Sequence, residues 1–79
     1  MNSQSLSFFQ LNTQYLVLDV EDQNGDQFSE RIMEMGLTRG SVIEIAYEAP
    51  FGGTLAIKCR GTLIAIRSED AKRIKVRAL

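Results

Sequence analysis

The spacing of hydrophobic residues changes along this chain, and each change predicts a different element. Residues 15–21 are rich in leucine and valine and follow a polar turn, which is typical of a strand. Phe28, Ile32 and Met35 then recur at i, i+4 and i+7, which places them on one stripe of a helix of two or three turns. We expect this stripe and the nearby Met33 to pack against the core.

Two glycines specify the end of the predicted helix. Gly36 follows Met35 at the position where a left-handed residue ends a helix, and Leu37 stands where a Schellman motif places its apolar contact. Gly40 fits the third position of a type II turn, which requires a positive φ. The sequence therefore predicts a compact reversal of the chain before the next strand.

After Ser41 the spacing of hydrophobic residues changes to two, which predicts a meander of three strands. We expect strands at residues 42–48, 54–60 and 62–66, joined by a hairpin loop over residues 49–53 and a tight connection at Gly61. The alternating residues that define these strands are Ile43, Ile45, Tyr47, Leu55, Ile57, Cys59, Thr62, Ile64 and Ile66.

The last part of the chain predicts a single helical turn and a strand. Ser68 is a suitable N-cap, and the acids Glu69 and Asp70 fall in the first turn, where the helix dipole favours negative charge. Ile74 and Val76 then alternate with basic residues in a half-buried strand. About five short strands in a chain of 79 residues can enclose one small core, so we expect a single, mainly β domain bent into a barrel.

Composition argues against catalysis and against a membrane span. The longest apolar runs are four residues, whereas a membrane helix needs about 20. Histidine is absent, which removes the commonest metal ligand and general acid–base. The sequence shows no phosphate-binding glycine loop and no nucleophile beside a base. Because its start has no export signal either, we expect a cytoplasmic protein that is not an enzyme.

Charge is unevenly distributed along the chain. Residues 1–57 hold two basic and eight acidic side chains, whereas residues 58–79 hold seven basic and two acidic ones. The basic stretch at residues 67–77 lacks aromatic side chains on which bases could stack, and the pI is about 5.3. We therefore expect a solvated charged face and no binding of nucleic acid.

Two features suggest a metal site but are better explained by structure. Residues 19–30 carry acids at positions one, three and twelve of a calcium-type loop, yet the glycine stands at position seven instead of six and no helix precedes it. Cys59 is in phase with Leu55 and Ile57, so we expect it to be a small buried hydrophobic residue rather than a ligand. Without histidine, a transition-metal site would need Cys59, methionine and carboxylates from separate elements.

Phe51 is the most informative surface candidate. An aromatic side chain at the tip of a Pro-Phe-Gly-Gly loop either folds back as a lid on the barrel or stands exposed as an anchor for a partner. The sequence leaves both interpretations open.

Three segments in order resemble the ferrous iron transport protein A (FeoA) family. They read Arg-Ile-Met-Glu-Met-Gly-Leu-Thr-Arg-Gly-Ser at 31–41, Ala-Pro-Phe-Gly-Gly at 49–53, and Arg-Gly followed by Leu-Ile-Ala-Ile-Arg-Ser-Glu-Asp-Ala within 60–71. The chain departs from the family at Arg39, where proline is usual, and at Phe51, where leucine is usual.

The resemblance implies an SH3-like barrel over residues 1–79, with a core of about residues 6–77. It also implies a small cytoplasmic accessory of bacterial ferrous iron uptake that docks on a membrane transporter with a cytosolic GTPase domain and modulates its assembly or activity. Such a protein reaches the inner membrane through its partner, without inserting. The alternative is a transition-metal-binding regulatory domain similar to the C-terminal domain of repressors of the diphtheria toxin repressor type.

We expect a partner to contact one loop and the neighbouring turn. The residues of this expected contact are Pro50, Phe51, Gly52, Met35 and Leu37, and the structural turns are expected at Gly36, Gly40, Gly52 and Gly61. Binding of Fe(II) or another transition metal is implied by the family alone, and no ligand residues are assigned. The sequence specifies neither the oligomeric state nor the sign of the effect on the partner.

Overall fold

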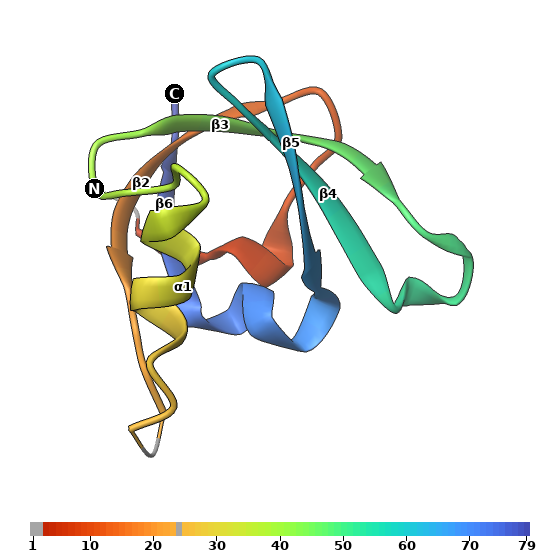
Figure 1. The fold of residues 1–79 in the computed structure, drawn as a ribbon. Helices are drawn as coiled ribbons and strands as arrows, with labels where there is room; N and C mark the ends of the chain where they lie inside the picture. The colour runs from red at the N-terminus through yellow and green to blue at the C-terminus, as the bar shows by residue number, and fades with distance from the viewer. Residues whose placement is uncertain (1–2, 24) are drawn as a thin grey trace.

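The computed structural model describes residues 3–23 and 25–79 and shows a single antiparallel sheet with one α-helix (Figure 1). The strands are β1 (Gln4–Ser5), β2 (Gln14–Val20), β3 (Val42–Glu48), β4 (Thr54–Cys59), β5 (Thr62–Arg67) and β6 (Ile74–Ala78). The helices are α1 (Phe28–Glu34) and the 3-10 helices η1 (Leu6–Phe8), η2 (Pro50–Gly52) and η3 (Ser68–Arg73). The sheet order is β1-β6-β2-β3-β4-β5, so the expected small, mainly β fold is confirmed.

The structure contains one strand more than the five expected. β1 is two residues long and pairs with β6, with Gln4 opposite Val76 and Ser5 opposite Lys75. Leu6, which follows directly, is fully buried. Two residues are too few to show the alternation of sides by which a strand is recognised in a sequence, so this strand was missed.

The sheet curls around a core to which β2 to β6, α1 and η3 all contribute buried side chains. β2 pairs with both β3 and β6, and its register with β6 shifts between Val17 and Asp19. A bulge of this kind bends and twists a strand. The buried hydrophobic residues that fill the space are Leu6, Tyr15, Val17, Phe28, Ile32, Leu37, Ile43, Ile45, Leu55, Ile57, Cys59, Ile64, Ile66, Ala71, Ile74 and Val76.

Tyr47 does not share the buried face of β3, contrary to the alternation in the sequence. Ile45 lies opposite Ile57, but Tyr47 lies opposite Ala56, so one extra residue is accommodated in β3 between them. This shift turns Tyr47 outward, where 56% of its surface is exposed.

The helical stripe was predicted correctly at Phe28 and Ile32, which are buried, but wrongly at the methionines. Met33 and Met35 are each 48% exposed. α1 ends at Glu34, so Met35 is already the cap, and the chain folds Leu37 into the core in its place.

The expected Schellman motif ends α1. Gly36 has φ +104°, and its N–H donates to the carbonyl of Met33 at 2.9 Å. The N–H of Leu37 donates to the carbonyl of Ile32 at 3.2 Å, and the Leu37 side chain is fully buried. These are the two hydrogen bonds that define the motif.

The turn at Gly40 ties the end of the helix to the sheet. Gly40 has φ +84°, and the N–H of Ser41 donates to the carbonyl of Thr38 at 3.0 Å, as expected for a type II turn. The N–H of Gly40 donates to the carbonyl of Val17 at 2.8 Å, and the N–H of Val17 donates to the carbonyl of Ser41 at 2.9 Å. This exchange fixes where β3 begins beside β2.

The expected single helical turn is a 3-10 helix of six residues, η3, and its cap differs from the prediction. Arg67 occupies the N-cap position, and Ser68 is the first helical residue. The Oγ atom of Ser68 is buried and has no hydrogen-bond partner within the described residues. The prediction failed because β5 continues one residue further than expected, through Arg67.

The two oppositely charged parts of the sequence interleave in the fold. β6 lies beside β2, so Lys75 approaches Glu21 at 3.6 Å and Arg73 pairs with Asp26. The linear asymmetry of charge is therefore partly neutralised within the structure. In the described part of the chain, no helix has the length and apolar character needed to cross a membrane.

Replacing Gly36 by alanine should destabilise the protein by about 1–2 kcal/mol, the cost of a left-handed conformation for an L-residue. No atom lies within 4 Å of the added Cβ, so the effect comes from the backbone alone. Gly53 offers a matched control, since its φ is −88° and its Cβ position is equally open. Gly53→Ala should change the free energy of unfolding by less than about 1 kcal/mol. Urea denaturation measures both, and equal stabilities would contradict the assignment.

Candidate partner-binding surface

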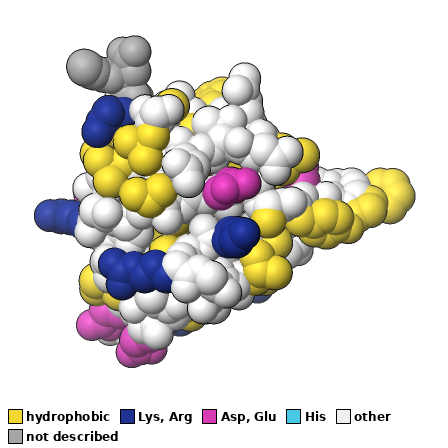
Figure 2. Space-filling view, turned by 90° about the horizontal axis from the view of Figure 1, so that it is seen from above, with side chains coloured by type: hydrophobic (Ala, Val, Ile, Leu, Met, Phe, Trp, Pro, Cys, Tyr) yellow, Lys and Arg dark blue, Asp and Glu magenta, His cyan; other side chains and the backbone are white. Residues whose placement is uncertain are grey.

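The β3–β4 hairpin projects from the body of the molecule, and hydrophobic surface runs along this arm to its tip (Figures 1 and 2). Two hydrogen bonds close the loop, from the N–H of Ala49 to the carbonyl of Thr54 at 2.8 Å and from the N–H of Gly52 to the carbonyl of Ala49 at 3.0 Å. The loop is therefore a defined structure that presents η2 to solvent.

Phe51 stands fully exposed in the middle of this loop. Its backbone is left-handed, with φ 73° and ψ 9°, and Gly52 follows with φ 71°. A left-handed conformation costs a bulky L-residue about 1–2 kcal/mol, and such strain concentrates at functional sites. Of the two interpretations left open by the sequence, the lid on the barrel is excluded.

A groove of about 390 Å³ borders the loop on the side of Gly52. Its lining residues are Ser7, Phe9, Glu48, Gly52, Leu55, Ser68, Glu69 and Lys72. Glu48, Glu69 and Lys72 add charged groups of both signs to a lining whose exposed surface is mainly apolar. A partner that covers Phe51 would therefore also meet hydrogen-bonding groups.

The neighbouring turn contributes less to this surface than expected. Leu37 is fully buried and offers no side-chain surface to a partner, so its expected role as a contact is corrected. Met35 is half-exposed, but it lines a different groove, of about 170 Å³, between α1 and β5. The remaining candidates at the loop are Pro50, Phe51 and Gly52.

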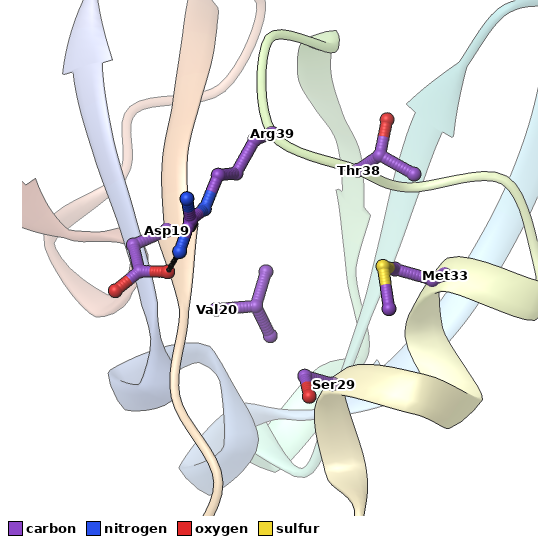
Figure 3. A pocket seen from close by; sticks show the side chains of 6 residues that line it. All are labelled: Asp19, Val20, Ser29, Met33, Thr38 and Arg39. Atoms are coloured by element: carbon purple, nitrogen blue, oxygen red, sulfur yellow. Dashed lines mark hydrogen bonds and ion pairs between the residues drawn. The ribbon is translucent and has the colours of Figure 1, made fainter.

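A third groove, of about 330 Å³, lies between β2, α1 and the turn after α1 (Figure 3). Its lining residues are Asp19, Val20, Ser29, Met33, Thr38 and Arg39. Arg39 pairs with Asp19 at 3.0 Å, and both side chains are substantially exposed. An exposed pair of this kind contributes about 0.2–1 kcal/mol. It links the turn to β2 at the position where the family usually has proline.

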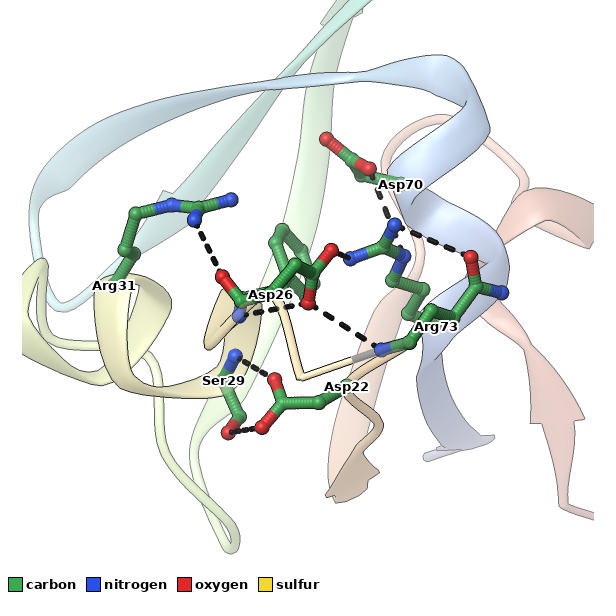
Figure 4. Close-up of polar contacts among 8 residues, drawn as sticks. Asp22, Asp26, Ser29, Arg31, Asp70 and Arg73 are labelled. Atoms are coloured by element: carbon green, nitrogen blue, oxygen red, sulfur yellow. Dashed lines mark hydrogen bonds and ion pairs between the residues drawn. The ribbon is translucent and has the colours of Figure 1, made fainter.

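Asp22 and Asp26, which lie within the stretch that resembles a calcium loop, cap α1 (Figure 4). Asp22 accepts hydrogen bonds from the N–H of Ser29 at 2.6 Å and from its hydroxyl at 3.0 Å. Asp26 accepts from the N–H of Phe28 at 3.2 Å and from Arg73. These bonds satisfy N–H groups at the start of the helix, which have no partners within it.

Arg73 joins the start of α1 to η3. Its guanidinium lies 5.0 Å from the centre of the Phe28 ring, an arrangement typical of a cation–π contact, and 3.8 Å from Asp70. The hydrogen bond from Arg73 is the main cause that holds the pKa of Asp26 below its ordinary value. Burial opposes this shift, and the N–H groups of Phe28 and Gln23 add to it. We expect this cluster to be structural.

Cys59 is a small core residue, as expected. It is 3% exposed, and its Sγ lies 3.7 Å from the carbonyl oxygen of Gly36. Within residues 3–23 and 25–79, no three side chains from histidine, cysteine, aspartate and glutamate come together in a way that could hold a metal ion. These residues do not fit a resident transition metal, and we derive no function through one.

The fold defines a small SH3-like barrel whose accessible features are a projecting loop and shallow grooves. The profile of the FeoA domain matches residues 4–78, and the chain belongs to this family. The family is associated with ferrous iron transport and consists of small accessory domains that are not known as enzymes. A comparison with curated proteins found no match.

Solved structures support this assignment. The zinc complex of FeoA from Stenotrophomonas maltophilia, a prokaryotic SH3 domain protein, is 31% identical with a TM-score of 0.78, over 91% of this chain and 87% of that one. An iron uptake regulatory protein (FeoA) is 25% identical with a TM-score of 0.83, over 100% of both chains. A manganese-dependent transcriptional repressor has a TM-score of 0.87 at 18% identity, over 100% of this chain and 38% of that one, which shows a shared fold alone.

Replacing Phe51 by alanine should leave the free energy of unfolding unchanged within about 0.5 kcal/mol, because the side chain has no core contacts to lose. Phe28 is a matched control, since it is 3% exposed and its removal should cost about 3–5 kcal/mol. Thermal or urea denaturation compares the two variants. A large loss of stability in Phe51→Ala would show that the loop folds back onto the barrel in solution.

Asp26→Asn should be less stable than the wild type at pH 7, and the difference should shrink as the pH falls below about 4. The pKa of Asp26 is lowered in the folded state, so its contribution is complete above the unfolded pKa and is lost as pH falls through the folded one. Urea midpoints measured from pH 7 to pH 2 test this. A constant difference at all pH values would contradict the assignment.

Proposed function

We propose that this protein is a cytoplasmic, non-enzymatic accessory of ferrous iron uptake that docks on the cytosolic part of a membrane iron transporter. There it modulates the assembly or the nucleotide hydrolysis of the transporter, and Fe(II) is the cargo of the partner. Family membership supports the link with ferrous iron transport. The observation that carries the docking proposal is Phe51, fully exposed in a left-handed loop at the tip of a projecting hairpin.

The loop has the physical properties of a binding anchor. Burying an exposed phenylalanine against a partner contributes about 1.5–3 kcal/mol, and aromatic residues dominate the energy of many interfaces. The hydrogen bonds at Ala49 and Gly52 already order the loop, so binding loses little conformational entropy. Glu48, Glu69 and Lys72, in the groove beside Gly52, then supply charged groups that fix the orientation of the partner.

Phe51→Ser should weaken binding to the detergent-solubilised ferrous iron transporter at least tenfold, a change of about 1.4 kcal/mol. Val42→Ser is a matched control because Val42 is also an exposed hydrophobic residue, 44% exposed, but lies at the other end of β3. Immobilised protein and purified transporter give the affinities, and GTP hydrolysis by the transporter gives the effect on activity.

Two results would count against the proposal. Wild-type protein that neither binds the transporter nor changes its GTP hydrolysis would exclude docking on it. Equal weakening by Phe51→Ser and Val42→Ser would show that the loop has no special role, even if docking itself occurs.

A further inference from the structure

β5 forms an open edge of the sheet. It pairs with β4 alone, in an unbroken register from Thr62 opposite Cys59 to Arg67 opposite Thr54. Arg60 and Gly61, with φ 55° and 81°, make the two-residue hairpin between these strands, and the residues that flank such a loop form a hydrogen-bonded pair. The backbone groups of Leu63, Ala65 and Arg67 therefore point away from β4.

Within the strand itself, β5 lacks the usual protections of a sheet edge. Natural edges are kept short, bulged, or interrupted by proline and by inward-facing charges. The opposite edge of this sheet, β1, follows the rule because it is two residues long. β5 is six residues long and contains no bulge and no proline, and its one charged residue is Arg67 at its end. Such an edge is suited to pairing with an added strand.

A groove lined by both hydrophobic and charged residues lies beside this edge and defines one face of a strand that pairs there. The groove of about 170 Å³ is lined by Phe28, Arg31, Ile32, Met35, Ala65, Ile66, Arg67 and Asp70, so it separates α1 from β5. Successive side chains of an added strand point to opposite faces. Those on the inner face would meet the half-exposed Met35, above the buried Ile32, which favours hydrophobic residues there.

The charge around the groove favours acidic residues at the other positions of the added strand, those that alternate with the hydrophobic ones. Neither Arg31 nor Arg67 forms an ion pair with a carboxylate of the described residues. The one acid in the lining, Asp70, faces Arg73 at 3.8 Å. The groove therefore presents uncompensated positive charge to a ligand, which suits carboxylates and disfavours lysine and arginine.

We propose that the open edge of β5 binds an extended segment of another protein in which hydrophobic and acidic residues alternate, and that this segment joins the sheet as an added strand. The Leu63, Ala65 and Arg67 backbone groups supply hydrogen bonds. The groove beside α1 receives the hydrophobic side chains. Arg67 alternates with the buried Ile64 and Ile66 and so lies on the outward face of β5, where it attracts the acidic side chains of the opposite face. This surface is separate from the Phe51 loop and does not rest on the docking function proposed above.

The full chain, labelled with ¹⁵N, can be titrated with a blocked seven-residue peptide that alternates valine and glutamate. Amide shift changes should be confined to β5, its hairpin with β4, and α1. Hydrogen exchange at Leu63, Ala65 and Arg67 should slow at least tenfold, because their N–H groups become bonded. The counterpart that alternates valine and lysine should bind at least tenfold more weakly. Shift changes elsewhere, or unchanged exchange at these amides, would overturn the proposal.

Three variants separate the contributions of backbone and charge. Ala65→Pro removes an outward N–H that β4 does not use, and it should abolish binding of the acidic peptide. Arg67→Glu leaves the backbone intact, so it remains informative if the proline variant does not fold, and it should weaken binding of the acidic peptide at least tenfold. Arg77→Glu reverses an exposed charge on β6 and should have no such effect. Equal loss in both charge variants would overturn the proposed site.

Sedimentation tests whether a second copy of the chain is the occupant instead. Sedimentation should show a monomer in the absence of peptide, and a dimer that Ala65→Pro dissociates would overturn the proposal. Phe51→Ser should bind the peptide as the wild type does, so this site can fail or succeed independently of docking on the transporter.

Discussion

The left-handed backbone at Gly36 is the constraint on which the rest of this structure depends. It stops α1 after seven residues and turns the chain so that Leu37, rather than Met35, enters the core. The next turn, at Gly40, exchanges hydrogen bonds with Val17 and so sets β3 beside β2. Because the chain is too short for a second layer of core, no other packing would compensate if this reversal were lost.

The small core leaves no internal cavity for chemistry among the described residues, and several large hydrophobic side chains, such as Phe51 and Leu63, stay on the outside of the barrel. Shallow grooves lie beside the projecting loop, at the turn after α1, and between α1 and β5. None of them is deeply enclosed, whereas hydrogen bonds close the projecting loop and β5 presents an unpaired backbone edge. The two proposed sites use these surface features: the loop binds through an aromatic side chain, and the edge of β5 binds through strand pairing.

Electrostatics in this protein serve the fold more than long-range attraction. Between β2 and α1, the carboxylates of Asp22 and Asp26 accept hydrogen bonds from N–H groups of the helix, and Asp26 also accepts one from Arg73. The guanidinium of Arg73 lies over the Phe28 ring. Thus a stretch that resembles a calcium loop by composition acts as a helix cap, and the basic C-terminal part supplies its counter-charge. Arg31 donates to the carbonyl of Asp26 at 2.8 Å, and neither it nor Arg67 pairs with a carboxylate of the described residues.

The sequence by itself determined the features that depend on local backbone geometry: the helical stripe at Phe28 and Ile32, the reversal at Gly36 and Gly40, and the three-strand meander. It also identified Phe51 as the candidate anchor, without deciding its exposure. Only the tertiary structure decided that Phe51 points to solvent, that a bulge turns Tyr47 outward, that β1 adds a strand, and that Arg73 meets Asp26 across 47 positions. Periodicity and φ are properties of neighbouring residues, whereas exposure, register and ion pairing depend on which distant segments the folded chain brings together.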